Sequence, residues 1–218
     1  RIILGVRPCD VQSFAVMDRL FLGGDIVDPY WAERRKSTTI IGYAFDAVDP
    51  ADFYTTFGIG AADPAGSDIF MVKGEGTFLL KGITERGEEL LDSMKTLEDA
   101  SAQDEAYFEE KIAEGAGLKT RTLATEGIAE KLEEVFEDPY WIEAAAPCLN
   151  CGACTFVCPT CHCFDIQDET LFGEGARKRI WDSCMFTDFT LHTSGHNPRT
   201  KKSQRLRQRI CHKFSYYV

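Results

Sequence analysis

The sequence predicts an α+β protein in which an N-terminal α/β domain is followed by a small, cysteine-rich domain made mostly of helix and loop. Two observations support this division. Strand-like and helix-like apolar patterns alternate up to residue 138, and eight of the nine cysteines follow residue 147. Because Asp138-Pro139 breaks the helical pattern, we place residues 1–138 in the first domain and residues 139–218 in the second.

Apolar periodicity predicts the elements of both domains. Period-two or continuous apolar runs indicate strands, and apolar residues three or four apart indicate helices. Asp10 is suited to cap the first helix, and Gly23-Gly24 ends it. The segment 46–67 carries Pro50, Pro64 and several glycines, so we expect mostly loop there. We expect strands over 1–6, 38–45, 69–73 and 77–82, and helices over 11–22, 29–36, 85–94, 98–114, 123–136 and 140–146.

Composition and charge exclude several classes of protein. At 44% hydrophobic and 27% charged residues, the composition is that of an ordinary globular chain, and no apolar run is long enough to cross a membrane. The net charge is −11, which argues against nucleic acid as a general partner. Residues 176–218 are basic, so we expect this segment to dock an acidic partner surface or to surround an anionic cofactor. The chain opens on an apolar strand without an initiator Met, and we expect it to be a fragment of a longer protein.

Four cysteines form the strongest motif, Cys148-Leu-Asn-Cys151-Gly-Ala-Cys154-Thr-Phe-Val-Cys158-Pro159. This is the C-x2-C-x2-C-x3-C-P spacing of bacterial ferredoxins, which bind [4Fe–4S] clusters through thiolates. Small residues at 152 and 153 allow the backbone to pass close to an inorganic core. The second domain is therefore predicted to be a ferredoxin-like iron–sulfur domain. Structural zinc is the alternative, but zinc usually takes two C-x2-C pairs that are well separated.

The remaining cysteines suggest more than one cluster. In two-cluster ferredoxins the last cysteine of the run ligates the other cluster, so Cys158 either completes the first cluster or serves a second. Further candidate ligands follow it at Cys161, Cys163 and Cys184. Cys211 and Cys9 are weaker candidates. We expect one or two [4Fe–4S] clusters.

Other candidate sites are weaker. His192 and His196 are four residues apart, but no zinc-protease pattern accompanies them, so we expect them to form structural hydrogen bonds. No G-x-G-x-x-G motif and no nucleophile–base pair is recognisable. The C-x-x-C pairs and the odd number of cysteines favour a reducing compartment, the cytoplasm, in an anaerobe.

Several motifs occur in an order that is specific enough to name a family. They are Gly5-Val-Arg-Pro-Cys-Asp10, Asp28-Pro-Tyr-Trp31, the cysteine run through Cys163, Trp181-Asp-Ser-Cys184, Ser194-Gly-His-Asn197 and His212-Lys-Phe-Ser-Tyr216. With them the chain resembles the iron–sulfur electron-transfer subunit of sulfhydrogenases (the beta subunit), of anaerobic sulfite reductases and of heterodisulfide-reductase-linked complexes, a family with a 4Fe-4S dicluster domain. Two departures stand out. Relatives usually continue into a second cysteine run, and they often carry cysteines in the loop that here spans residues 52–58.

The resemblance implies a subunit that catalyses no bond-making itself. It would relay electrons between a flavin- and NAD(P)H-binding subunit and a catalytic redox subunit. Two other functions stay open from the residues alone: a zinc-stapled interaction module, and a dehydrogenase subunit whose N-terminal half binds flavin or nicotinamide. Metal analysis and a test for released flavin separate the three.

Overall fold

The computed structural model describes residues 1–216 and divides the chain into two compact units, residues 1–123 and residues 124–218. Each unit contains both helices and strands, so the predicted α+β class is confirmed. The domain boundary that we expected near residue 138 concerns separately folding domains and stays a prediction. In the structure, the helix just before that position packs within the second unit.

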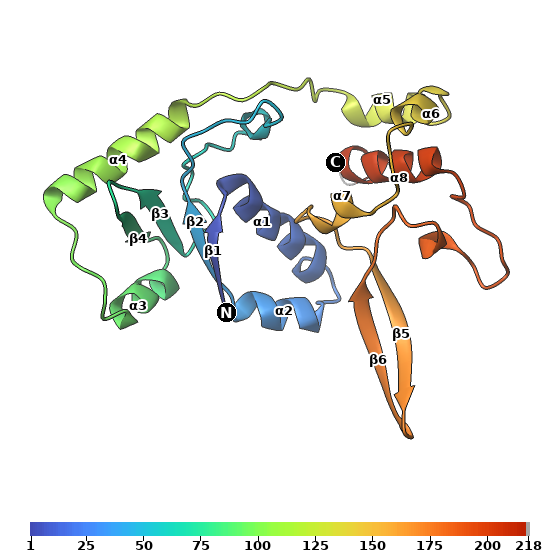
Figure 1. Ribbon diagram of the computed structural model, residues 1–218, viewed down its shortest axis with the longest axis horizontal. Coiled ribbons are helices and arrows are strands. Elements are labelled where there is room, and N and C mark those ends of the chain that lie inside the picture. The colour runs from blue at the N-terminus through green and yellow to red at the C-terminus, as the bar shows by residue number, and fades with distance from the viewer. Residues whose placement is uncertain (217–218) are drawn as a thin grey trace. The chain divides into compact units, whose positions relative to one another are not determined.

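The first unit is built on a four-stranded mixed sheet with the order β1-β2-β3-β4 (Figure 1). Its parallel strands are β1 (Ile2–Val6), β2 (Thr39–Tyr43) and β3 (Ile69–Lys73), and β4 (Phe78–Gly82) is antiparallel to β3. The Gly74 N–H donates to the Thr77 carbonyl at 3.0 Å and closes the β3–β4 hairpin. All four strands lie within two residues of their predicted bounds.

Four helices accompany this sheet: α1 (Pro8–Leu22), α2 (Pro29–Lys36), α3 (Glu85–Ser93) and α4 (Ala102–Gly117). A short 3-10 helix, η1 (Tyr54–Phe57), lies in the predicted loop. In α1 the expected cap is wrong. The helix begins at Pro8, because proline supplies the backbone angle of a first helical position and needs no amide partner there. Asp10 lies in the first turn instead, where its charge favours the positive end of the helix.

One core cluster of the first unit lies between β3 and α4. Phe70 and Val72 of β3 are buried against Ala62 and Phe108. The close approach of Gly115 in α4 to Ala62 leaves no space for a side chain, since a Cβ there would lie 2.4 Å from the Ala62 Cβ. The loop that carries Ala62 therefore packs closely on α4 beside this cluster.

The second unit consists of short helices and one hairpin. Its helices are α5 (Ile128–Glu134), α6 (Tyr140–Ala144), α7 (Ala153–Phe156) and α8 (Lys202–Phe214), with a 3-10 turn η2 (Asp188–Thr190). The long helix α8 packs against α5 and α6. Within residues 1–216, no helix combines the length and the apolar character that crossing a membrane requires.

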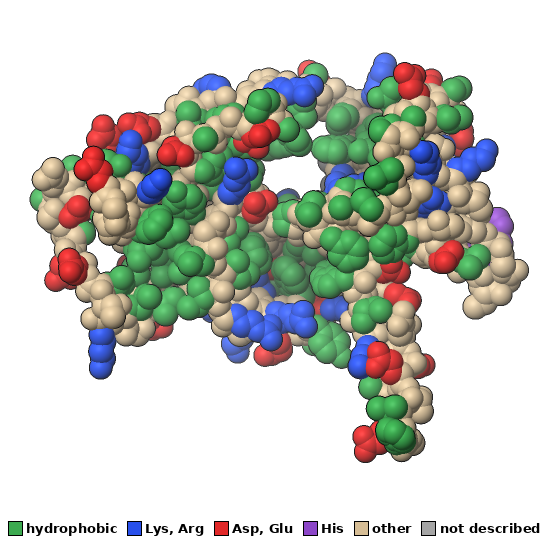
Figure 2. Space-filling model, in the orientation of Figure 1, with side chains coloured by type: hydrophobic (Ala, Val, Ile, Leu, Met, Phe, Trp, Pro, Cys, Tyr) green, Lys and Arg blue, Asp and Glu red, His purple; other side chains and the backbone are tan. Residues whose placement is uncertain are grey.

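The hairpin of β5 (Phe164–Leu171) and β6 (Glu174–Trp181) was not predicted. Figure 1 shows it projecting from the helices of its unit, and Figure 2 shows apolar and charged side chains mixed along it. Almost every residue in it is exposed, so it has no buried face and lacks the apolar alternation that marks a half-buried strand. Positive φ angles at Phe172 and Gly173 form its turn.

Candidate metal centre

The cysteine run lies in the loop around α7, and its first turn is shaped by left-handed backbone. Asn150 and Gly152 have φ angles of 56° and 74°. The Asn150 backbone N–H donates to Sγ of Cys148 at 3.4 Å. Backbone N–H groups that point at a ligand sulfur are a usual way in which proteins hold and tune an iron–sulfur cluster.

Gly152 is required by a neighbouring side chain. A Cβ at this position would lie 2.7 Å from Cε1 of Phe186, and the backbone is left-handed there. Glycine is the residue that tolerates both conditions. The structure shows the Phe186 ring as one group that this glycine accommodates, and the expectation that it also makes room for an inorganic core stays a prediction.

A buried hydrogen bond joins the run to the segment that carries Cys184. The Thr155 hydroxyl donates to the Ser183 Oγ at 2.7 Å, and the Met185 N–H donates to the same oxygen at 3.1 Å. Both Thr155 and Ser183 are buried. This contact holds two parts of the chain together that are 28 residues apart in sequence.

Four of the candidate cysteines form two thiol pairs. The Cys161 thiol donates to the sulfur of Cys158, which lowers the pKa of Cys158 and raises the pKa of Cys161. In the same way, the Cys184 thiol lowers the pKa of Cys163, and its own pKa is raised. Each pair therefore places two sulfurs within hydrogen-bond reach of each other.

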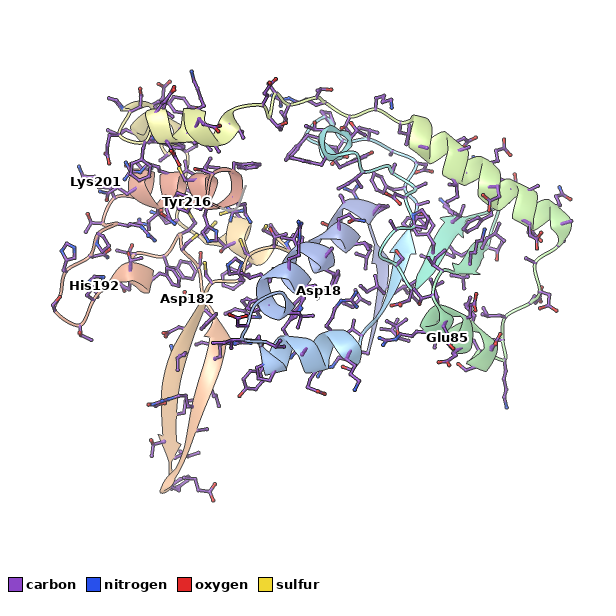
Figure 3. The ribbon with its side chains drawn as sticks, turned by 180° about the vertical axis from the view of Figure 1, so that it is seen from behind. Asp18, Glu85, Asp182, His192, Lys201 and Tyr216 are labelled. Carbon is purple, nitrogen blue, oxygen red and sulfur yellow. The ribbon has the colours of Figure 1, made fainter. Side chains whose placement is uncertain are left out.

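The hairpin is what brings Cys163 to Cys184. Phe164 pairs with Trp181 in the ladder, and the Asp182 N–H donates to the Cys163 carbonyl at 3.0 Å. Figure 3 labels Asp182 at the base of the hairpin. A cysteine that precedes β5 and one that follows β6 therefore meet at the open end of the ladder.

Cations from α8 point toward the cysteine loop. Arg209 donates Nη1 to Sγ of Cys161 at 3.2 Å and Nη2 to the Cys154 carbonyl at 2.5 Å. Lys202 donates to the carbonyls of Ala146 and Cys148 at 2.7 and 3.3 Å. Lys201 and Tyr216, labelled in Figure 3, flank this helix. The sequence indicated a basic segment, but only the helical spacing of α8 shows which cations reach the loop.

The candidate cysteines differ in exposure. Cys151 and Cys154 are exposed, Cys184 is buried, and the others between residues 148 and 163 are half-buried. A site with some exposed and some buried thiols has one side open to an approaching molecule.

Cys211 and Cys9 are the two weaker candidates. Cys211 is buried in α8, where burial raises its pKa and its charged neighbours are Arg207 and Glu133. Cys9 belongs to the first unit and packs against the buried cluster that contains Phe45 and Tyr54. Burial also raises the pKa of Cys9. Within the second unit, neither a hydrogen bond nor a charge interaction links Cys211 to another cysteine among the described residues.

The two histidines of the C-terminal loop contact each other. Their ring centroids are 5.4 Å apart, and the His192 N–H donates to the His196 carbonyl at 2.9 Å. Both are exposed. The hydrogen bond between them is a backbone bond, so the structural role that we expected of the two side chains stays a prediction.

The first unit contains a cavity of about 270 Å³ at the carboxyl ends of β2 and β3. Tyr43, Lys73, Tyr107 and Lys111 are among its lining residues. Ligand pockets for small molecules usually measure about 300–1,000 Å³, so this cavity lies below the size expected for a flavin or a dinucleotide.

The donor set of the second unit fits an iron–sulfur cluster. Thiolates are the ligands of such clusters. The Arg209 guanidinium, which donates to Sγ of Cys161 at 3.2 Å, puts a positive charge beside the negative charge that a thiolate-ligated cluster carries. Among residues 1–216, no three His, Cys, Asp or Glu side chains converge closely enough to hold a single metal ion.

Comparisons with known proteins agree with this chemistry. Residues 147–218 match the family model of the 4Fe-4S dicluster domain. Over 210 residues the chain is 31% identical to "Sulfhydrogenase 2 subunit beta" of Pyrococcus furiosus, and the match covers 95% of this chain and 62% of that protein. The chain thus spans less than two thirds of that relative. No solved structure matches.

The second unit is therefore an iron–sulfur domain of the 4Fe-4S dicluster class, which holds [4Fe–4S] clusters. Over most of its length the chain is similar to the sulfhydrogenase beta subunit, and residues 147–218 belong to the 4Fe-4S dicluster class. The resemblance seen in the motifs and the predicted cofactor are both confirmed.

Proposed function

We propose that this protein is an electron-transfer subunit that relays electrons between a flavin- and NAD(P)H-binding subunit and a catalytic redox subunit. The observation that carries the proposal is the loop of thiols backed by the cations of α8, within a domain of the 4Fe-4S dicluster class. A bound cluster supplies one-electron transfer, and the protein supplies ligands, burial and hydrogen bonds that set its potential.

The thiols divide into two ligand groups in this proposal. Cys148, Cys151 and Cys154 hold one cluster, and Cys158 is either its fourth ligand or a ligand of the neighbouring cluster. The second group contains the other three candidates, Cys161, Cys163 and Cys184. The exposed thiols at 151 and 154 leave one side of the domain open to a partner, which electron transfer between proteins requires.

Two observations support partners as the source of the other cofactors. The cavity at the carboxyl ends of β2 and β3 is small for a flavin or a dinucleotide, and a larger cavity in the first unit, of about 460 Å³, is lined almost entirely by charged side chains, unlike the mostly apolar pockets that bind such cofactors. The similar protein from Pyrococcus furiosus carries the word subunit in its own name. We therefore place flavin, nicotinamide and the terminal reaction in other subunits, and the whole assembly in a reducing compartment, the cytoplasm.

The first test is metal content after anaerobic purification. We expect iron and acid-labile sulfide in equal amounts, about four of each per cluster, and an electron paramagnetic resonance signal that appears on reduction with dithionite. Stoichiometric zinc without iron would instead support a zinc-stapled interaction module. Flavin released by heat denaturation would support a dehydrogenase subunit.

The second test concerns the relay. NADPH or NADH should leave the clusters of the isolated chain oxidised and should reduce them once the flavoprotein of the same complex is added. Reduction of the clusters by NADPH or NADH in the absence of any flavoprotein would contradict the proposal that a separate subunit binds the flavin and the nicotinamide.

A further inference from the structure

Two cations on one face of α8 hold the stretch of chain between Cys154 and Cys161. Arg209 and Lys213 are four residues apart, so they lie one above the other on the helix. Arg209 donates to the Cys154 carbonyl and to Sγ of Cys161, at 2.5 and 3.2 Å. Lys213 donates to Oγ1 of Thr160 at 2.9 Å, and the same oxygen lies 3.3 Å from Sγ of Cys158.

Arg209 is suited to a role that lysine cannot fill. Its guanidinium makes two bonds in a fixed fork, one to a sulfur and one to a backbone oxygen seven residues earlier in the chain. A guanidinium holds such a geometry rigidly, whereas an ammonium is a flexible point charge. The Arg209 side chain is also half-buried, so water screens its charge only in part.

We propose that Arg209, together with Lys213, is a positioning residue that holds the thiols of the 154–161 stretch and raises the reduction potential of the cluster bound there. This inference rests on the proposed function. Reduction adds one electron, and therefore one negative charge, to the cluster and its thiolates. A fixed cation against a ligand sulfur stabilises the reduced state more than the oxidised state. The electron comes from dithionite in the test below, and no covalent bond is formed or broken.

Arg207 provides a matched control on the same helix. It is also half-buried, but its Nη1 donates to the Phe136 carbonyl and to Glu137, at 2.7 and 3.0 Å. Its guanidinium lies 3.7 Å from the centroid of the Phe136 ring. Arg207→Met therefore removes the same charge from the same helix without removing a bond to the cysteine loop.

The experiment compares the full chain with Arg209→Met, Arg209→Lys, Lys213→Met and Arg207→Met. Iron and sulfide are counted first, and dithionite titrations followed by paramagnetic resonance then give the midpoint potentials. We expect Arg209→Met to make the equilibrium constant for one-electron reduction of the cluster about tenfold smaller. This change lowers the midpoint potential by about 59 mV. Arg207→Met should cause less than half of that shift.

A second readout separates charge from geometry. The rate of iron loss to a chelator should rise in Arg209→Lys, because lysine keeps the charge but cannot make both bonds, while its potential stays closer to that of the parent chain. Lys213→Met should also increase iron loss, and Arg207→Met should not.

The outcomes distinguish this inference from the proposed function. A parent chain that binds no iron overturns both. A parent chain with clusters whose potential and iron loss are the same in Arg209→Met and Arg207→Met overturns only the role of Arg209. Arg209→Met could lose its cluster during purification, and the other two variants then decide. If both Arg209→Lys and Lys213→Met release iron at the rate of the parent chain and have its midpoint potential, the inference is overturned.

Discussion

The Thr155 hydroxyl donates to the Ser183 Oγ at 2.7 Å, inside the second unit. Thr155 belongs to the cysteine run, and Ser183 precedes Cys184 directly. Both residues are buried, so water cannot replace the bond if one partner is removed. The bond therefore couples the position of the run to the position of Cys184.

Thr155→Val tests this coupling. Valine keeps the shape of threonine but leaves the buried Ser183 oxygen with one donor fewer, which should lower the free energy of unfolding by about 1–3 kcal/mol. Denaturant unfolding of the parent chain and the variant under anaerobic conditions measures the difference. In a double-mutant cycle with Ser183→Ala, the double variant should lose less than the sum of the two single losses. Strictly additive losses would show that the bond contributes nothing.

Gly152→Ala should disturb the cysteine loop. The new Cβ meets the Phe186 ring at 2.7 Å, and the residue must also adopt a φ of 74°, which costs an alanine roughly 1–2 kcal/mol before any clash. We expect lower iron content and lower thermal stability.

Gly173→Ala is the control for the backbone strain alone. Gly173 has a φ of 87°, and a Cβ there meets nothing within 4 Å. A Gly173→Ala chain should lose some stability but keep its iron. Equal iron content in the two glycine variants would contradict the role given to the Phe186 contact.

Cys184→Ala and Cys211→Ala should differ in iron content. The Cys184 thiol lies within hydrogen-bond reach of Cys163, the candidate ligand at the base of the hairpin, so its removal should cost about four irons, one cluster. Cys211 lies buried in α8 without a hydrogen bond or a charge interaction to another described cysteine, so its removal should cost about 1 kcal/mol of packing and no iron. Iron and sulfide analysis of both variants decides. Loss of a cluster in Cys211→Ala would make that cysteine a ligand.

Asp104 should make the stability of the first unit depend on pH in the acid range. The hydroxyl and the backbone N–H of Ser101 both donate to its carboxylate, at 2.6 and 2.9 Å, and these bonds lower the pKa of Asp104 below its usual value. Because the folded-state pKa is the lower one, the stabilisation is present above the unfolded value, about 4, and is lost as pH falls through the folded value. Asp104→Asn should therefore be less stable than the parent chain at pH 7 and equally stable in strong acid.

Glu105→Gln serves as the control for Asp104. It removes the same charge from the same turn of α4 and leaves the Ser101 bonds intact. Unfolding curves for the three chains across pH 2 to 7 (about the range over which carboxylates titrate) measure the effect. A gap between Asp104→Asn and the parent chain that is constant over this range would refute the linkage.

Local sequence signals determined much of the fold. The strands of the first unit are apolar runs closed by turns, and α2 is bounded by Asp28, whose side chain accepts the Trp31 N–H at 2.8 Å. These are short-range patterns, and burial on the sheet reinforces them. The exposed hairpin β5–β6 escaped prediction because its ladder and its ion pairs, such as Arg177 with Asp168 at 2.7 Å, stabilise it without any buried face.

The sequence by itself determined the chemistry of the site. The spacing from Cys148 to Cys158 indicates a cluster loop, since consecutive thiolates at such intervals suit one inorganic core. Only the tertiary structure decided which other groups meet that loop. Cys163 lies near Cys184 because β5 and β6 pair as an antiparallel hairpin, which the sequence did not predict, and the two cysteines flank its open end. Arg209 reaches Cys161 because α8 turns one of its faces to the loop. Contacts between segments that are distant in the sequence depend on how helices and strands pack against each other, and residue spacing alone does not determine that packing.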